Sequence, residues 1–187
     1  DGYELSIDSL VYNGEIIICG IADRHIYYPP HFVERGHTLP STLDKEILDE
    51  TVNVFKQGVA ALGLTHGAAK GDIKVTSKGI KICEIAARLS GGYMSGWTYP
   101  YASGVNLTKN AIQLAIGQRP DILETSNPLH TAAEWSFISI PGKINEILNK
   151  NEARNIAHIK EMFLRVQPGQ HVTCLLYTSP SPRDSTS

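Results

Sequence analysis

The sequence predicts an α+β fold in which packed helices cover an antiparallel sheet, and three observations support this expectation. Strand-like segments pair around two short turns, Asn13-Gly14 and Ser77–Gly79. Asn-Gly is a strong signal for a two-residue hairpin turn, and a final glycine suits the left-handed position of a three-residue loop. Between these hairpins, apolar residues recur at helical spacing up to Leu62, which predicts one long amphipathic helix.

The first hairpin is expected to pair residues 3–12 with residues 15–23. Apolar and polar residues alternate along the first strand, which is typical of a sheet with one buried and one solvated face. Pairing through a two-residue turn places Glu4 opposite Asp23 and near Arg24. On pattern alone, Glu4 is an acidic residue at an exposed strand end.

A long connection is predicted for residues 24–40, which hold three histidines spaced six residues apart. This spacing fits no common structural zinc pattern, so we do not expect a zinc site there. A connection of this length is typically functional or disordered. The segment Ser41–Asp44 then supplies an N-cap and an acidic first turn, so a helix is expected to run to about Leu62 and to end at Gly63.

The second hairpin carries the most informative charges. With Thr76 facing Ile80, the predicted register sets Asp72 opposite Glu84 on one face. Two like charges in that position destabilise a sheet, whereas a divalent cation with oxygen ligands would turn the pair into a binding site. The alternative is an acidic hairpin at the sheet edge that binds no metal.

The residues after this hairpin add features suited to ligand binding. Arg88 lies four positions after Glu84 and offers a planar fork for phosphate or carboxylate. The Gly91-Gly92 pair lets the backbone approach a ligand closely. The aromatic-rich residues 93–103 either line a substrate pocket or pack in the core.

The chain is expected to divide into three parts. Residues 1–120 form the main domain, whose N-terminal part is missing and whose last helix covers residues 106–116. Residues 121–175 form a small, truncated α+β appendage. Residues 176–187 form a disordered tail rich in serine and proline. This tail resembles translated sequencing-adapter sequence, and the alternative is a natural flexible tail.

Composition favours a soluble cytoplasmic enzyme over a nucleic-acid-binding or membrane protein. The 187 residues include 17 basic and 19 acidic residues, for a net charge of −2, and no basic run stands out. No apolar stretch approaches the roughly 20 residues of a membrane span. The three cysteines are too few and too irregularly spaced for a zinc site or a disulfide framework, so reduced thiols are expected.

The segment Glu84–Gly92, with an acidic residue twelve positions before it, resembles the metal-binding end of the ATP-grasp fold. That superfamily includes biotin carboxylase, glycinamide ribonucleotide synthetase and the L-amino-acid ligases. The resemblance implies that Asp72 and Glu84 hold Mg2+ or Mn2+ on the phosphates of ATP, and that Arg88 is a catalytic residue contacting phosphate or substrate. Asp72 stands where glutamate is commoner, and Ala86 stands where many relatives have a metal-binding asparagine.

Two further segments resemble parts of the same superfamily. Residues 2–8 resemble the strand that follows the adenine-binding hinge, which implies that Glu4 contacts the nucleotide. The Glu-Arg-Gly-His segment resembles a Glu-x-x-His segment of L-amino-acid ligases, which implies that Glu34 and His37 bind substrate. From the segment Glu84–Gly92, Arg88 and Gly91-Gly92 are also expected to bind substrate. The alternative for each segment is a set of exposed polar residues without a ligand.

The resemblance implies an ATP-dependent ligase that joins a small-molecule carboxylate to an amine or a thiol through an acyl phosphate, releasing ADP and phosphate. Residues 1–120 would be part of an ATP-grasp catalytic domain, and the chain alone would be inactive because half of the nucleotide clamp is missing. A homo-oligomer is compatible with this function. Two alternatives stay open: a catalytically silent, nucleotide-binding relative, and a β-rich interaction domain that binds no nucleotide.

Overall fold

The computed structural model describes residues 2–121, 128–137 and 140–172. The chain forms two compact units, the first ending at Ser136 and the second beginning at Phe137. The first unit holds a six-stranded sheet and the second a two-stranded sheet. All strand pairs are antiparallel and helices pack on the larger sheet, so the predicted α+β class is confirmed.

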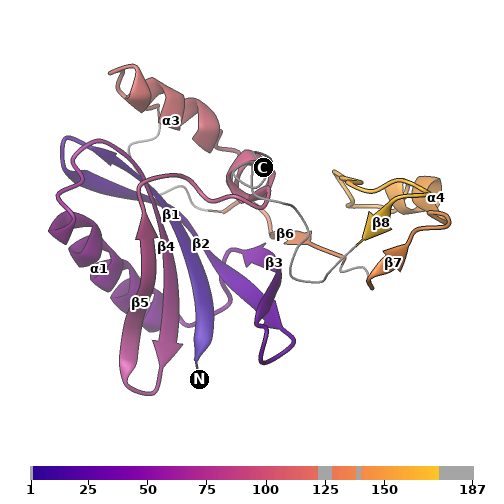
Figure 1. Cartoon of the computed structure of the whole chain (residues 1–187). Coiled ribbons are helices and arrows are strands. Elements are labelled where there is room, and N and C mark those ends of the chain that lie inside the picture. Colours follow the sequence, from indigo (N-terminus) through magenta and orange to yellow (C-terminus); the bar gives the residue numbers. More distant parts are fainter. Residues whose placement is uncertain (1, 122–127, 138–139, 173–187) are drawn as a thin grey trace, which may run out of the picture. The chain divides into compact units, whose positions relative to one another are not determined.

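The larger sheet has the strand order β5-β4-β1-β2-β3-β6 (Figure 1). Its strands are β1 (Tyr3–Tyr12), β2 (Glu15–Tyr27), β3 (Val33–Leu39), β4 (Gly67–Thr76), β5 (Gly79–Ala86) and β6 (Ala132–Trp135). The long connection predicted for residues 24–40 is wrong, because β2 and β3 occupy most of it and leave only residues 28–32 between them.

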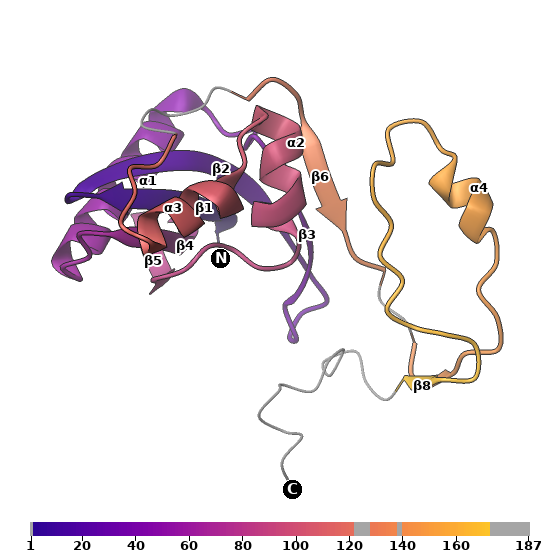
Figure 2. The ribbon, with the colours of Figure 1, turned by 90° about the horizontal axis from the view of Figure 1, so that it is seen from above.

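Helices cover both faces of this sheet (Figures 1 and 2). The helical segments are α1 (Lys45–Ala61), the π-helical turn η1 (Met94–Thr98), α2 (Tyr99–Ser103) and α3 (Leu107–Ala115). On one face, Phe55 of α1 packs in a core with Leu5 and Ile73 of the sheet. On the other face, residues of η1, α2 and α3 form a second core with β1, β2 and β3. The helices predicted to end at Leu62 and to cover residues 106–116 therefore form close to their expected bounds.

The second core corrects the expectation that the polar side of β1 is solvated. Ser6 and Asp8 are both buried, because the residues that follow β5 cover this side. Tyr99 is fully buried, and its hydroxyl donates to the carbonyl of Gly20 at 3.2 Å. A Cβ at Gly20 would lie 2.4 Å from Cε1 of Tyr99, so this tyrosine packs in the core rather than lining a substrate pocket.

Two β-bulges change the predicted strand registers. In the first hairpin, Ser9 pairs with Ile18 and Asp8 with Gly20, so Leu5 rather than Glu4 lies opposite Asp23. A bulge adds one residue to a single strand and shifts every later pair by one position.

In the second hairpin, the turn closes one residue earlier than predicted. Val75, not Thr76, faces Ile80, so the predicted register is wrong next to the turn. A bulge then shifts the pairing back between Asp72 and Ile73, and Asp72 does face Glu84. The two deviations cancel at the pair that matters for the metal prediction.

In its described residues, the second unit has a strand pair and one short helix. Its elements are β7 (Gly142–Lys143), α4 (Lys150–Arg154) and β8 (His171–Val172). The tail predicted for residues 176–187 lies outside the described residues, and the boundary predicted after residue 120 stays a prediction. Across the part of the chain that the structure describes, the helices are too short or too polar to cross a membrane.

Candidate active site

Charged side chains from four neighbouring strands meet on the sheet face opposite α1. We call this set the charged cluster; its members are Glu4 of β1, Arg24 of β2, Glu34 of β3, and Lys70, Asp72 and Lys74 of β4. Side chains of a strand alternate between the two faces, so the three even-numbered positions of β4 share one face. The cluster contains three carboxylates and three cations, so its formal charges balance.

Arg24 joins the carboxylates of this cluster. Its Nη2 and Nε lie 2.5 Å and 3.0 Å from Oε2 of Glu34, while Nη1 lies 3.3 Å from Glu4 and 3.4 Å from Asp72. Burial by itself lowers the pKa of Arg24, but the hydrogen bond to Glu34 and the charges of the three carboxylates raise it overall. The guanidinium therefore stays charged and holds the nucleotide, substrate and metal candidates of β1, β3 and β4 together.

Asp72 is nearly buried, with an exposed fraction of 9%. Its Oδ2 accepts a hydrogen bond from Nζ of Lys70. Its Oδ1 is buried and accepts no hydrogen bond from any described residue, although Arg24 lies within ion-pair distance. Glu84, opposite Asp72 in the register, is exposed, and its nearest ion-pair partner is Arg88 at 4.0 Å.

These two carboxylates fit a magnesium ion better than a structural metal. Over the described ranges, the side chains form no group of three or more potential metal ligands. Mg2+ does not need such a group, since it usually keeps several waters and binds one or two carboxylates together with substrate phosphates. The buried Oδ1 of Asp72 and the exposed carboxylate of Glu84 are hard oxygen donors of this kind.

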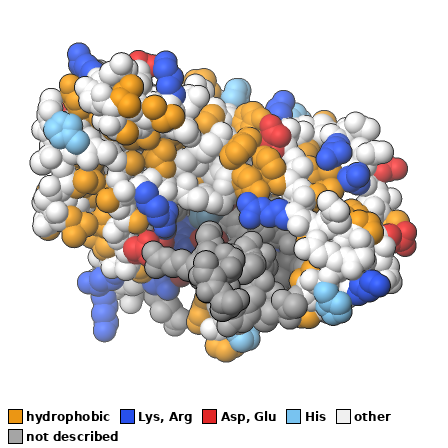
Figure 3. All heavy atoms as spheres, turned by 45° about the horizontal axis from the view of Figure 1, so that its top comes forward, with side chains coloured by type: hydrophobic (Ala, Val, Ile, Leu, Met, Phe, Trp, Pro, Cys, Tyr) orange, Lys and Arg blue, Asp and Glu red, His pale blue; other side chains and the backbone are white. Residues whose placement is uncertain are grey.

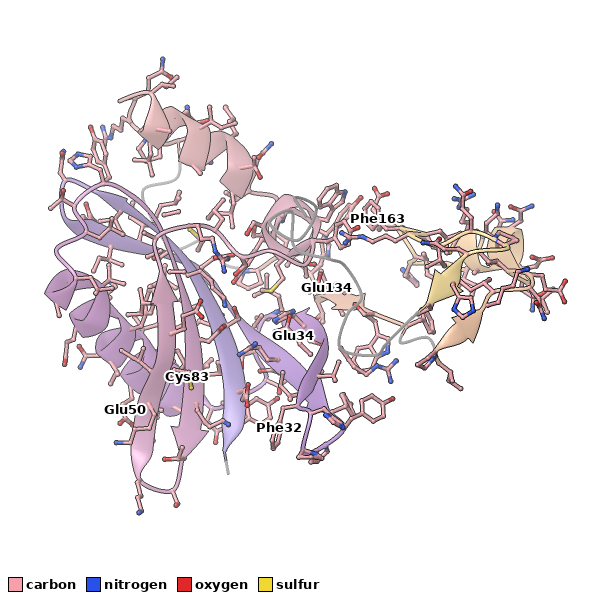
Figure 4. The ribbon with its side chains drawn as sticks, viewed as in Figure 1. Phe32, Glu34, Glu50, Cys83, Glu134 and Phe163 are labelled. Atoms are coloured by element: carbon pink, nitrogen blue, oxygen red, sulfur yellow. The ribbon has the colours of Figure 1, made fainter. Side chains whose placement is uncertain are left out.

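His37 of β3 connects the charged cluster to β6. Its Nδ1 lies 2.7 Å from Oε1 of Glu134, and its Nε2 lies 3.7 Å from Oε2 of Glu34. Burial raises the pKa of Glu134, although the hydrogen bond to His37 opposes this change. Figure 4 shows Glu34 and Glu134 on the neighbouring strands β3 and β6. The imidazole therefore has a carboxylate on each side.

The residues that follow β5 lie next to Glu134 at one end of this site. The Arg88 side chain is exposed and donates from Nη1 to the carbonyl of Leu89 at 3.1 Å. Gly91 and Gly92 follow, and a Cβ at Gly92 would lie 3.2 Å from Oε1 of Glu134. The absence of a side chain at Gly92 thus leaves room for the carboxylate that contacts His37.

The structure brings Glu4, Glu34 and Asp72 together around Arg24, and His37 joins them through Glu34. Glu84 lies opposite Asp72 on the edge strand β5, and Arg88 lies 4.0 Å from Glu84. No sequence pattern assigned Arg24, Glu134, Lys70 or Lys74 to the site. Their spacing around Asp72 could have placed the two lysines on its face. Glu134 gave no such signal, because it joins His37 across 97 positions of the chain.

The face shown in Figure 3 carries acidic and basic side chains scattered among hydrophobic ones. The described residues on that face form no basic stripe of the kind that tracks a nucleic-acid backbone. The expectation that nucleic acid is not a partner stays a prediction.

All residues of the charged cluster lie in the part of the chain that matches a known domain family. The family described as "ATP-grasp domain" matches residues 1–96, about half of the chain. Carnosine synthase 1 of Gallus gallus is 29% identical over 119 residues, which cover 64% of this chain and 13% of that protein. The chain therefore spans only a small part of the curated relatives it matches.

Solved structures show the same fold. L-amino acid ligase from Bacillus licheniformis superposes with a TM-score of 0.85 at 21% identity, covering 96% of this chain and 46% of that one. The biotin carboxylase domain of Hydrogenobacter thermophilus 2-oxoglutarate carboxylase, in complex with MgADP, ADP and bicarbonate, has a TM-score of 0.58 at 17% identity, covering 71% and 29%. The predicted ATP-grasp fold is confirmed.

Proposed function

Because the chain belongs to the ATP-grasp family, we propose that the protein carrying it is an ATP-dependent carboxylate–amine ligase. One observation supports this most strongly: residues assigned separately to nucleotide, substrate and metal meet around Arg24 on one face of the sheet. Carnosine synthase 1 and the L-amino acid ligase, to which the chain is similar, carry names of this type of enzyme. We assign the protein small-molecule substrates and a cytoplasmic location.

Asp72 and Glu84 are the proposed ligands of a magnesium ion that would neutralise the charge of the ATP phosphates. Asp72 is held in place by Lys70 and Arg24, so its carboxylate is oriented before the nucleotide binds. Lys70 and Lys74 add positive charge on the same face, where triphosphate would otherwise be repelled by three carboxylates. Glu4 contacts both Lys74 and Arg24 and contributes to the nucleotide side of the site.

In the proposed reaction, an oxygen of the substrate carboxylate attacks the γ-phosphorus of ATP and ADP leaves. The amine nitrogen then attacks the acyl carbon, phosphate leaves, and the ammonium loses a proton. Arg88 would stabilise the negative charge that develops on the transferred group, since its fork is exposed beside Glu84. A thiol in place of the amine would follow the same two steps.

Glu34, His37 and Glu134 are the proposed amine-binding groups. Two carboxylates flank one imidazole, and an ammonium group is the natural partner for such a negative environment. The raised pKa of Glu134 reflects a partly desolvated carboxylate, and a cationic ligand would relieve the cost of that burial. Gly91 and Gly92 would let the substrate backbone approach these groups.

A second candidate function is nucleotide binding without catalysis. Two features favour it: Ala86 stands where a metal-binding side chain would be expected from the resemblance, and Asp72 already has two cationic partners. Such a protein would bind ATP but release no ADP.

The test is magnesium-dependent ADP release by the protein carrying this chain, with the amino acids supplied singly and in pairs. The ligase proposal predicts ADP and phosphate in equal amounts, formed only with both substrates. A stoichiometric AMP peak on chromatography contradicts it, since AMP would mean attack at the α-phosphate. ATP binding by calorimetry without any ADP release would favour the non-catalytic relative.

A further inference from the structure

Asp8 is a buried carboxylate that plays no part in the proposed reaction. It lies on β1 and is fully buried. Its Oδ1 accepts hydrogen bonds from the backbone N–H of Ser90 at 2.9 Å and from the Ser90 hydroxyl at 3.0 Å. Its Oδ2 lies 3.0 Å from the Ser95 hydroxyl, which also lies 2.8 Å from the carbonyl of Ser90. All of these donors belong to one segment, 82 and 87 positions away.

Burying this carboxylate costs free energy of folding, so its presence at this position needs an explanation. Lys70 is the register partner of Asp8 on β4, but its amine bonds Asp72 and not Asp8. The negative charge of Asp8 is therefore stabilised by hydrogen bonds from Ser90 and Ser95, and Lys70 contributes only a longer-range attraction. Burial raises the pKa of Asp8, and these hydrogen bonds oppose that change.

The segment bound by Asp8 contains the groups that the proposed mechanism needs next to Asp72 and Glu84. Arg88 lies two residues before Ser90, and Gly91-Gly92 come directly after it. Gly92 has a φ of +62°, a left-handed conformation that must be kept for the chain to turn there. A hydrogen bond at Ser90 therefore fixes the backbone between the catalytic arginine and the glycine pair.

We infer that Asp8 is a positioning residue, which fastens residues 88–92 to the sheet so that Arg88 and Gly91-Gly92 face the proposed site. The importance of that placement rests on the proposed function, but the fastening itself does not. Asp8 acts through the segment and touches neither nucleotide nor substrate.

Amide hydrogen exchange tests the fastening without any substrate. Asp8→Asn keeps the size of the side chain but removes the negative charge that accepts the hydrogen bonds from Ser90 and Ser95. We expect exchange of the amides in residues 88–92 to accelerate about tenfold or more, as for the loss of a hydrogen bond to a charged group, while the amides of β1 and β2 keep their protection.

The matched control is Ser6→Ala, at equal depth on the same side of β1. The Ser6 hydroxyl is buried and has no hydrogen-bond partner among the described residues, so its loss should leave the exchange of residues 88–92 unchanged. If Asp8→Asn does not fold, Ser90→Ala replaces it, since this change removes one of the bonds from the other side. Unchanged exchange at residues 88–92 in Asp8→Asn, or in Ser90→Ala where that variant replaces it, would overturn the inference.

A double-mutant cycle tests the positioning. If Asp8 acts through Arg88, then Asp8→Asn should lower ADP release in the wild-type background and have almost no further effect in Arg88→Ala. Equal effects in both backgrounds would show a general structural role and contradict the inference. If the wild-type protein releases no ADP at all, the proposed function fails, and the exchange experiment still decides the role of Asp8.

Discussion

Asp8 and Asp72 are two buried aspartates on neighbouring strands of one sheet face, and their charges are stabilised in different ways. Neutral N–H and O–H groups of Ser90 and Ser95 satisfy Asp8. Two cations, Lys70 and Arg24, hold Asp72, and one of its oxygens accepts no hydrogen bond from a described residue. The first arrangement gives both oxygens of the carboxylate hydrogen-bonding partners from one segment of the chain. The second leaves the oxygen of Asp72 that we propose as a metal ligand without a hydrogen bond from a described residue.

This difference matches the two roles that we propose, positioning of a segment for Asp8 and metal binding for Asp72. A carboxylate whose acceptor sites are filled by its own chain has little to offer an incoming cation. A carboxylate that is oriented by neighbours but not saturated can exchange one of them for a metal ion. On these two proposals, the same residue type has two functions within one sheet, and its hydrogen-bond and ion-pair partners determine which one.

The largest expected effect is on turnover when the proposed metal ligands, Asp72 and Glu84, are changed. Glu84→Gln in the protein carrying this chain keeps the size of the side chain but removes its charge, and we expect ADP release to fall roughly 10³-fold with the fold intact. Asp72→Asn should behave similarly, and the double variant should be scarcely worse than either single one, because residues that act as a unit are non-additive.

Glu50→Gln is the control for this change, since Glu50 is an exposed glutamate on α1 (Figure 4). It should turn over like the wild type in the same steady-state assay. Near-wild-type turnover of Glu84→Gln at low magnesium concentration would contradict the assignment of the metal pair.

The next largest effect is on ligand-induced stability. With ATP and Mg2+ at roughly 100 times their dissociation constants, a binding protein gains about 2.7 kcal/mol of unfolding free energy. We expect Asp72→Asn to lose most of the resulting shift in Tm and Asp8→Asn to keep it. Differential scanning fluorimetry measures both, and equal shifts in the two variants would remove the distinction between the two aspartates.

A smaller effect is expected on stability without ligand. Ser90→Ala combined with Ser95→Ala removes two hydroxyl groups that bond Asp8, and the unfolding free energy should fall by about 2 kcal/mol, or roughly 1 kcal/mol for each bond. Ser6→Ala should be neutral or slightly stabilising, since it removes a buried hydroxyl without a described partner. Urea denaturation distinguishes these outcomes, and equal losses in both variants would speak against an anchoring role for Asp8.

Sequence reasoning predicted what depends on local pattern. The first hairpin turn and the long helix follow from residues close together in the chain, whereas the Asp72–Glu84 pairing is right only because the early turn and the bulge cancel. The strand registers were harder, because each bulge inserts a residue at a cysteine, Cys19 or Cys83, that carries no bulge signal. The bulge at Cys19 moved the predicted partner of Glu4 by one position. The bulge at Cys83 cancelled the error made at the second turn.

The contacts that define the site could not be predicted, because they join distant segments. Glu134 meets His37 across 97 positions, and Asp8 meets Ser90 across 82. Asp8 also belongs to an alternating pattern that normally indicates a solvated face, and only the covering residues of η1, α2 and α3 reverse it. Burial of a polar strand face depends on what packs over it, which a local pattern does not contain.

The smallest expected effect is on the pH dependence of stability, and it follows from the burial of Asp8. Burial raises its pKa in the folded state above the ordinary value of 3.8. Between these two pKa values the folded state keeps a proton that the unfolded state has released. The stability of the wild type relative to Asp8→Asn should therefore fall as the pH rises from below 3.8 through the folded pKa, and then level off.

The groups around Asp8 do not mask this change. Burial raises the pKa of Cys19 to about 12 and that of Tyr99 well above its ordinary value, so both stay neutral in the acid range. Glu134, whose pKa burial also raises, is present in both proteins and cancels in their difference. Urea denaturation of both proteins from pH 3 to pH 7 measures the difference. The opposite result would be a wild type that gains stability over Asp8→Asn as the pH rises across this range. It would show that the hydrogen bonds from Ser90 and Ser95 outweigh burial, so that Asp8 is ionised more easily in the folded protein than in the unfolded chain.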